Sequence, residues 1–97
     1  MTTYLMFVKY SIDARGKVSA YRTKITNAVI EDSGGILKAA YALLGETDVV
    51  LIAEFPSTEK AMKASVALSK QLGIGFATTP AVSMDDFDKL IVGKEGA

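Results

Sequence analysis

Residues 36–55, ILKAAYALLGETDVVLIAEF, hold two apolar runs joined by the polar stretch Gly45-Glu46-Thr47-Asp48. A short linker with glycine and aspartate is typical of the turn between two antiparallel strands. We therefore predict a β-hairpin with strands over residues 36–44 and 49–55. Along the chain, one strand and one helix are expected before the hairpin, and one helix and one strand directly after it.

Before the hairpin, residues 4–10 read YLMFVKY, a bounded aromatic and branched run that predicts a strand followed by a polar loop over residues 11–16. From Val18, apolar residues recur at three- and four-residue steps up to Val29, which predicts an amphipathic helix. The polar residues expected on its other faces are Arg22, Lys24, Asn27 and Glu31. Gly34 and Gly35 are expected to end this helix, since glycine readily adopts the left-handed conformation.

After the hairpin, Pro56 closes the strand, and Ser57 or Thr58 is expected to cap a second helix. Small and medium side chains form the inward stripe of that helix: Ala61, Ala64, Ser65, Leu68 and Leu72. Gly73 is expected to end it, and a last strand follows over residues 74–82. Ser83 then caps a short helix over residues 84–91, and residues 93–97 are predicted to form a flexible tail.

The predicted order is βαββαβ with a short C-terminal helix, in one domain over residues 1–97. Two helices that each cross between parallel strands of one sheet lie on the same face, because both crossovers are right-handed. The fold class is therefore α+β, a ferredoxin-like two-layer sandwich. The opposite face of the sheet has no helix to cover it.

The uncovered face is expected to be apolar in its middle. Strand alternation assigns it two sets of residues: Leu5, Phe7 and Lys9 from the first strand, and Asp48, Val50, Ile52 and Glu54 at the second hairpin strand. A solvated sheet face normally carries polar residues throughout. Hydrophobic residues also make up 49% of the chain. We therefore predict that two copies pair sheet against sheet as a homodimeric α/β barrel; a well-packed monomer is the alternative.

Five residues are candidates for a cavity or ligand site in that barrel: Phe7, Lys9, Asp48, Glu54 and Thr78. Lys9 and Asp48 lie on antiparallel strands, so they form either a polar grip at the cavity mouth or a structural ion pair. Glu54 is either a general base in apolar surroundings or a solvated strand end. Thr78 offers a hydroxyl to a ligand or simply suits a strand. No catalytic residue is assigned.

The composition excludes several function classes. The chain has no cysteine and no histidine, which removes disulfide, thiolate and imidazole chemistry, and no metal or cofactor is expected. Eleven basic and eleven acidic residues balance, so nucleic acid and anionic membranes are not expected partners. The longest apolar runs fall far short of the ~20 residues that span a bilayer. The first residues lack a signal peptide pattern, so we expect a cytoplasmic protein.

The hairpin and its surroundings resemble the GYD-domain family. The resemblance rests on Leu44-Gly45-Glu46-Thr47-Asp48-Val49-Val50, on Glu54-Phe55-Pro56, and on the alanine-rich second helix. It implies a dimeric α/β-barrel fold, and it implies no reaction because the family is of uncharacterised function. Thr47 replaces the tyrosine of the family pattern. Pro80 replaces an arginine or leucine, and since proline lacks an amide donor we expect it at a sheet edge or a bend.

We expect a homodimer that binds a small, partly apolar molecule or serves as an accessory or regulatory module. The alternative is a cofactor-free enzyme, similar to a monooxygenase or isomerase, whose apolar cavity desolvates the substrate. A third possibility is an interaction protein with a filled barrel.

Overall fold

The computed structural model describes residues 1–10 and 20–96 and has the predicted order of elements. The elements are β1 (Thr2–Tyr10), α2 (Ala20–Asp32), β2 (Ile36–Ala42), β3 (Val49–Phe55), α3 (Thr58–Leu72), β4 (Ile74–Ala81) and α4 (Met84–Gly96). The predicted loop over residues 11–16 and the predicted helix start at Val18 lie outside the described residues.

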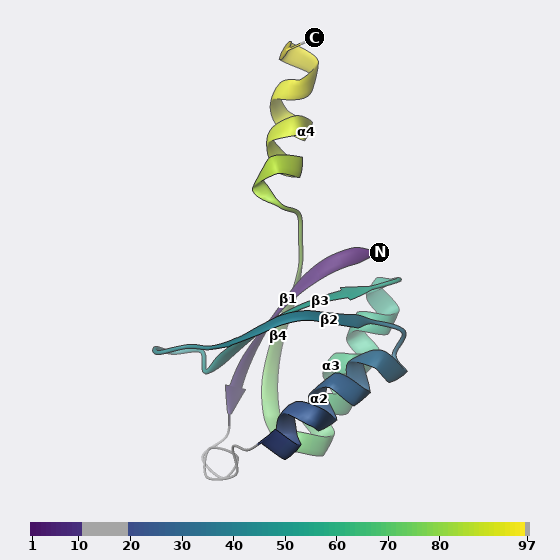
Figure 1. Ribbon diagram of the computed structural model, residues 1–97, viewed down its shortest axis with the longest axis vertical. Coiled ribbons are helices and arrows are strands. Elements are labelled where there is room, and N and C mark those ends of the chain that lie inside the picture. Colours follow the sequence, from purple (N-terminus) through teal and green to yellow (C-terminus); the bar gives the residue numbers. More distant parts are fainter. Residues whose placement is uncertain (11–19, 97) are drawn as a thin grey trace.

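The four strands form one antiparallel sheet in the order β2-β3-β1-β4, with β1 and β3 in the middle. Helices α2 and α3 lie on the same face of this sheet (Figure 1). This arrangement confirms the ferredoxin-like α+β sandwich. Pro80 lies in the edge strand β4, as its missing amide donor led us to expect.

The core lies between the sheet and the two helices. Among the residues whose burial the structure describes, it contains ten buried side chains: Tyr4, Met6, Val8, Ile30, Leu51, Ala53, Phe55, Ala61, Ala64 and Leu68. The strand residues among them confirm the predicted alternation, because Met6 is buried whereas its neighbour Phe7 is 36% exposed on the other face. We call that other face the open face; it contains Leu5, Phe7 and Lys9 of β1, Val50, Ile52 and Glu54 of β3, and Ile36, Ala39 and Tyr41 of β2.

Local sequence signals set the helix ends. Ser57 caps α3, its side-chain oxygen accepting from the amide of Lys60 at 3.2 Å, and Gly73 ends α3 at φ 64°. Gly34 ends α2 at φ 81°. Gly35 follows for a different reason: a Cβ there would lie 2.6 Å from Cε1 of Phe55, so only glycine lets the chain pass this close to β3.

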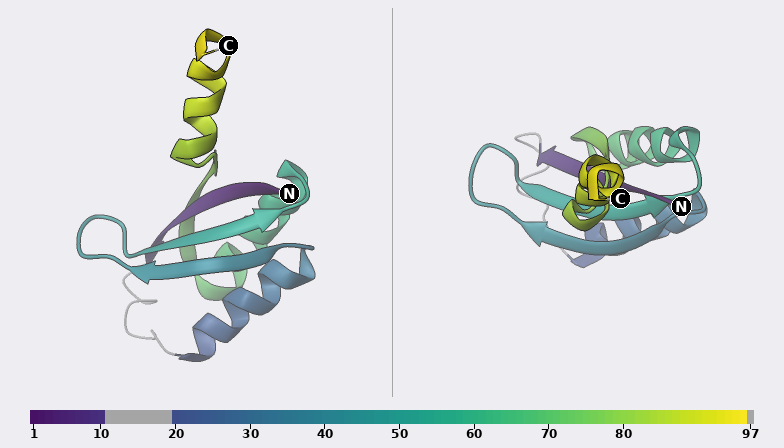
Figure 2. Two further views of the ribbon diagram at one scale, coloured as in Figure 1. Left: turned by 45° about the horizontal axis from the view of Figure 1, so that its top comes forward. Right: turned by 90° about the horizontal axis from the view of Figure 1, so that it is seen from above.

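Helix α4 is longer than predicted. Ser83 caps it as expected, its hydroxyl accepting from the amide of Asp86 at 3.1 Å. The sequence predicted an end at Ile91 and a flexible tail over residues 93–97, whereas the helix continues through Gly96. Figure 2 shows α4 projecting from the sheet on the side opposite α2 and α3.

Candidate functional site

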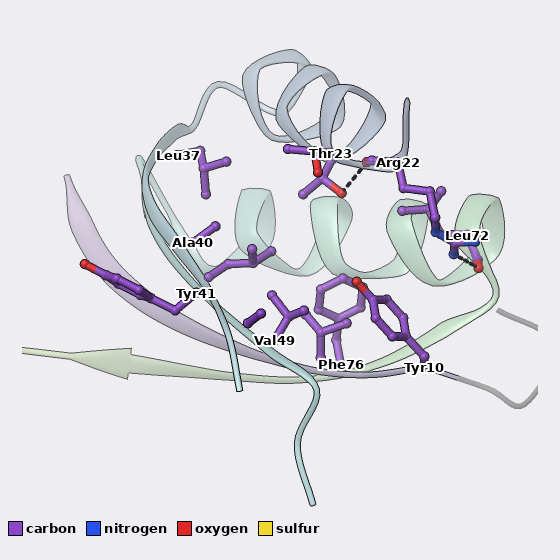
Figure 3. Close-up of a pocket in the computed structure, with 13 residues that line it drawn as sticks. Tyr10, Arg22, Thr23, Leu37, Ala40, Tyr41, Val49, Leu72 and Phe76 are labelled. Atoms are coloured by element: carbon purple, nitrogen blue, oxygen red, sulfur yellow. Dashed lines mark hydrogen bonds between the residues drawn. The ribbon is translucent and has the colours of Figure 1, made fainter. Parts of the chain in front are cut away.

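A cavity of about 240 Å³ lies between α2 and the sheet (Figure 3). It forms because the two helices cover the sheet unequally. α3 contributes three buried core residues, Ala61, Ala64 and Leu68, whereas Ile30 is the one buried core residue between positions 22 and 32 of α2. The N-terminal half of α2 turns Arg22, Thr23 and Thr26 toward the cavity instead of large apolar groups.

Apolar side chains from the sheet form most of the remaining wall. They are Val8, Leu37, Ala40, Ala42, Val49, Leu51 and Phe76, joined by Leu72 at the end of α3. The cavity exceeds the ~150 Å³ of an engineered apolar cavity that holds benzene. A small molecule with an apolar body therefore fits this space.

Arg22 supplies the positive charge at the cavity. Its Nη2 donates to the carbonyl oxygen of Leu72, in the last turn of α3, where the helix dipole favours a cation. Its Cζ lies 5.7 Å from the ring centroid of Tyr10, a cation–π distance. Its Nε is buried and has no hydrogen-bond partner among residues 1–10 and 20–96. Among the described residues, no carboxylate lies within salt-bridge distance of Arg22.

Hydroxyl groups add polar contacts next to this cation. The hydroxyl of Tyr10 points into the cavity between Arg22 and the sheet (Figure 3). Thr26 is already engaged, because its hydroxyl donates to the carbonyl of Arg22 at 2.9 Å. A guanidinium group and a phenol at one end of an apolar cavity form a suitable site for a molecule with an anionic group and an apolar body.

The sequence did not predict the position of Arg22. Apolar periodicity placed this residue off the inward face of α2, whereas the structure turns it to the cavity. The reason is the rotation of the helix, which is set by the burial of Ile30 in the core while Ala28, expected on the apolar stripe, is exposed. A positive charge one helical turn before Thr26 was the only local signal.

The five predicted site residues do not gather in this cavity. Phe7 and Lys9 lie on the open face and line a second, shallower groove of about 340 Å³ with Glu46 and Thr47 of the hairpin turn. Glu54 is half-buried on the same face, opposite Thr3. Thr78 faces the helices instead, and its hydroxyl lies 2.7 Å from that of Ser65 in α3.

Asp48 has a structural role. Its Oδ2 accepts a hydrogen bond from the amide of Tyr10 at 2.8 Å, and its own amide donates to the carbonyl of Val8 at 2.9 Å. The carboxylate therefore extends the β1–β3 pairing by one residue, and it forms no ion pair with Lys9. Because Tyr10 lines the cavity, Asp48 helps to hold one of the cavity's walls.

The described part of the chain contains no group of three or more acidic, histidine or cysteine side chains placed to hold a metal ion. None of its helices combines the length and the apolar character that crossing a bilayer requires.

The fold and the site define a small ferredoxin-like α+β domain with an apolar cavity beneath one helix. The chain belongs to the GYD domain family, whose sequence pattern matches residues 4–91. No curated protein sequence matches it.

Three solved structures share the fold. A transcriptional regulator superposes with a TM-score of 0.65 at 10% identity, over 87% of this chain and 52% of its own. MtbAldR superposes with a TM-score of 0.67 at 18% sequence identity, and the match covers 84% of this chain and 53% of MtbAldR. The leucine response regulatory protein LrpA of Mycobacterium tuberculosis superposes with a TM-score of 0.57 at 10% sequence identity, and the match covers 86% of this chain and 51% of LrpA. The chain thus spans about half the length of these structures, and identities this low show a common fold alone.

Proposed function

We propose that this protein is a homodimeric regulatory module that binds a small, partly apolar carboxylate between α2 and the sheet. The cavity beside Arg22 carries the proposal. A guanidinium whose buried Nε has no partner in the described part of the chain favours a planar anion, because a guanidinium and a carboxylate form charge-assisted hydrogen bonds. The apolar wall around Leu37, Val49 and Phe76 then accommodates the body of the molecule.

The regulatory part of the proposal rests on shared fold. The similar structures include a transcriptional regulator and a leucine response regulatory protein. Leucine itself combines a carboxylate with a branched apolar side chain, which is the chemistry that the cavity offers. This support is by analogy of fold, since function resides in sites and not in folds.

The homodimer rests on the open face. Phe7 is 36%, Ile36 48% and Tyr41 59% exposed there, on a surface with no helix above it. An apolar sheet face of this kind is buried efficiently against a second sheet about 10 Å away. Light scattering should give about twice the chain mass of 10.3 kDa.

Isothermal titration tests the ligand class. The probes are L-leucine and 4-methylpentanoate, each compared with its uncharged amide. We expect both carboxylates to bind more tightly than their amides. In Arg22→Gln the affinity for both carboxylates should fall about tenfold, because a lost hydrogen bond to a charged group costs about 1.5 kcal/mol. The affinity for the amides should stay unchanged.

A second variant tests the location without touching Arg22. Ala40→Phe places a large side chain in the cavity wall and should abolish binding of every probe. The matched control is Ala28→Phe, at an exposed position of α2 that does not line the cavity. Equal affinity of carboxylates and amides, or unchanged binding in Ala40→Phe, would overturn the proposed site.

A further inference from the structure

Helix α4 presents an apolar stripe to solvent. Met84, Phe87, Leu90 and Ile91 recur at three- and four-residue steps, and their exposed fractions run from 45% to 69%. None of the core residues, and none of the partly buried hydrophobic residues packed against the core, comes from this helix. The stripe therefore has no partner within the described part of its own chain.

A helix in this position needs a partner. Isolated helices shorter than ~12–15 residues are marginal in water, and α4 has 13 residues. Its good capping by Ser83 and its acidic first turn, Asp85 and Asp86, add only small increments. Most of its stability must therefore come from burying the apolar stripe.

The chain exposes more surface than a compact monomer of its mass, and the excess has the size of an interface. The accessible area is 6519 Å², whereas a compact monomer of this mass exposes about 5,400 Å². The surplus of roughly 1,100 Å² exceeds the ~800 Å² that each partner buries in a standard interface. The radius of gyration, 15.2 Å, likewise exceeds the ~12.5 Å of a compact domain of this length.

The direction of α4 indicates where the partner lies. The helix rises on the open-face side of the sheet, away from α2 and α3 (Figures 1 and 2). With 13 residues it is ~20 Å long, about twice the ~10 Å that separates two packed sheets. A second copy seated on the open face therefore meets α4 along its side.

We infer that α4 is a clasp that packs against the exposed edge strand β2 of a second copy of this chain. The inference rests on the proposed sheet-to-sheet dimer. A two-fold axis parallel to the strands, between two facing sheets, sets β4 of one copy over β2 of the other. The helix that follows β4 then lies beside the partner's β2 edge.

Strand β2 suits this contact. It is an edge strand, and its exposed apolar side chains, Ile36 and Tyr41, complement the stripe. Lys38, at the bulge of the strand, carries a charge opposite to that of the acidic first turn of α4. Covering β2 also protects unpaired backbone groups that otherwise invite aggregation.

The test compares two sets of variants by sedimentation. Phe87→Glu combined with Leu90→Glu places two charges on the stripe, and the control, Lys89→Glu, places one on the opposite side of the helix. We expect the dimer dissociation constant to rise at least tenfold in the double variant and to change less than twofold in the control. Both altered side chains are outside the core, so folding of the domain itself is preserved.

Circular dichroism provides the second measurement. On dilution through the dissociation constant, the wild-type helical signal should fall by the share of one 13-residue helix, because α4 unfolds when its partner leaves. A wild-type monomer at all concentrations would refute the proposed dimer and the clasp together. A wild-type dimer whose dissociation constant is unchanged in the double variant, or whose helical signal is independent of concentration, would refute the clasp alone.

Discussion

The carboxylate of Asp48 holds the backbone of Tyr10: its Oδ2 accepts from the Tyr10 amide at 2.8 Å, across 38 residues of sequence. The same residue closes the hairpin, since its carbonyl accepts from the amide of Leu43 at 2.9 Å. Asp48 thus joins the end of β1, the hairpin turn and one wall of the cavity.

Replacing Asp48 should therefore reduce stability. Asp48→Ala leaves the Tyr10 amide without its acceptor, and we expect the free energy of unfolding to fall by about 2 kcal/mol in urea denaturation. Asp48→Asn should cost less, because an amide oxygen still accepts. The control is Glu46→Ala, an exposed residue of the same turn. An equal loss for Asp48→Ala and Glu46→Ala would contradict this role.

Gly35 should not tolerate a side chain. A Cβ there would lie 2.6 Å from Phe55 Cε1 and 2.8 Å from the carbonyl oxygen of Glu54, which is backbone and cannot move aside. We expect Gly35→Ala to destabilise the protein by about 2–3 kcal/mol, as overpacking of a core does. Gly75→Ala is the matched control, since its nearest atom is an ordinary 3.8 Å away. Thermal unfolding of both variants decides the point, and similar melting temperatures would refute it.

The open face should respond to charge as an interface does. Phe7→Lys places an ammonium group in the middle of the proposed sheet-to-sheet contact and should shift the protein toward a monomer in light scattering. Met62→Lys makes the same kind of change on the outer surface of α3, where Met62 is 61% exposed, and should leave the mass unchanged. If both variants keep the wild-type mass, the open face is not the dimer interface.

The hydroxyl pair of Ser65 and Thr78, 2.7 Å apart, ties α3 to β4. Thr78→Val leaves Ser65 without this partner and should cost about 1 kcal/mol of unfolding free energy. Adding Ser65→Ala should recover part of that loss, because the unsatisfied hydroxyl is then gone. A double-mutant cycle in urea measures the coupling, and strictly additive losses would show that the pair contributes nothing.

The alternation of side chains along β1 gave the most dependable prediction from the sequence. Because side chains alternate strictly along a strand, the pattern from Tyr4 to Val8 assigned Met6 to the core and Phe7 to the open face without knowledge of any neighbour. Helix ends at Ser57, Gly73 and Ser83 were equally local, since each cap bonds only to its own helix. Element order and fold class follow from these local rules.

Helix orientation was less predictable. The apolar residues of α2 are spread around the helix instead of gathering on one side, so periodicity alone did not determine which side faces the sheet, and it misplaced Arg22. The candidate site residues also divided between two faces, because Thr78 occupies the helix side of β4 while Lys9 occupies the open side of β1. The length of α4 was underestimated, since the sequence predicted a helix over residues 84–91 only, whereas α4 continues through Gly96.

The sequence by itself determined the order of strands and helices along the chain, the core faces of β1 and β3 and the absence of thiol and imidazole chemistry, because these depend on composition or on neighbours within a few residues. The tertiary structure decided that Arg22 meets Tyr10 and the carbonyl of Leu72, and that Asp48 reaches the amide of Tyr10. It also decided that α4 projects away from the sheet on the side opposite α2 and α3. Such contacts join residues 12 to 50 positions apart, and only the packing of helices on the sheet brings them together.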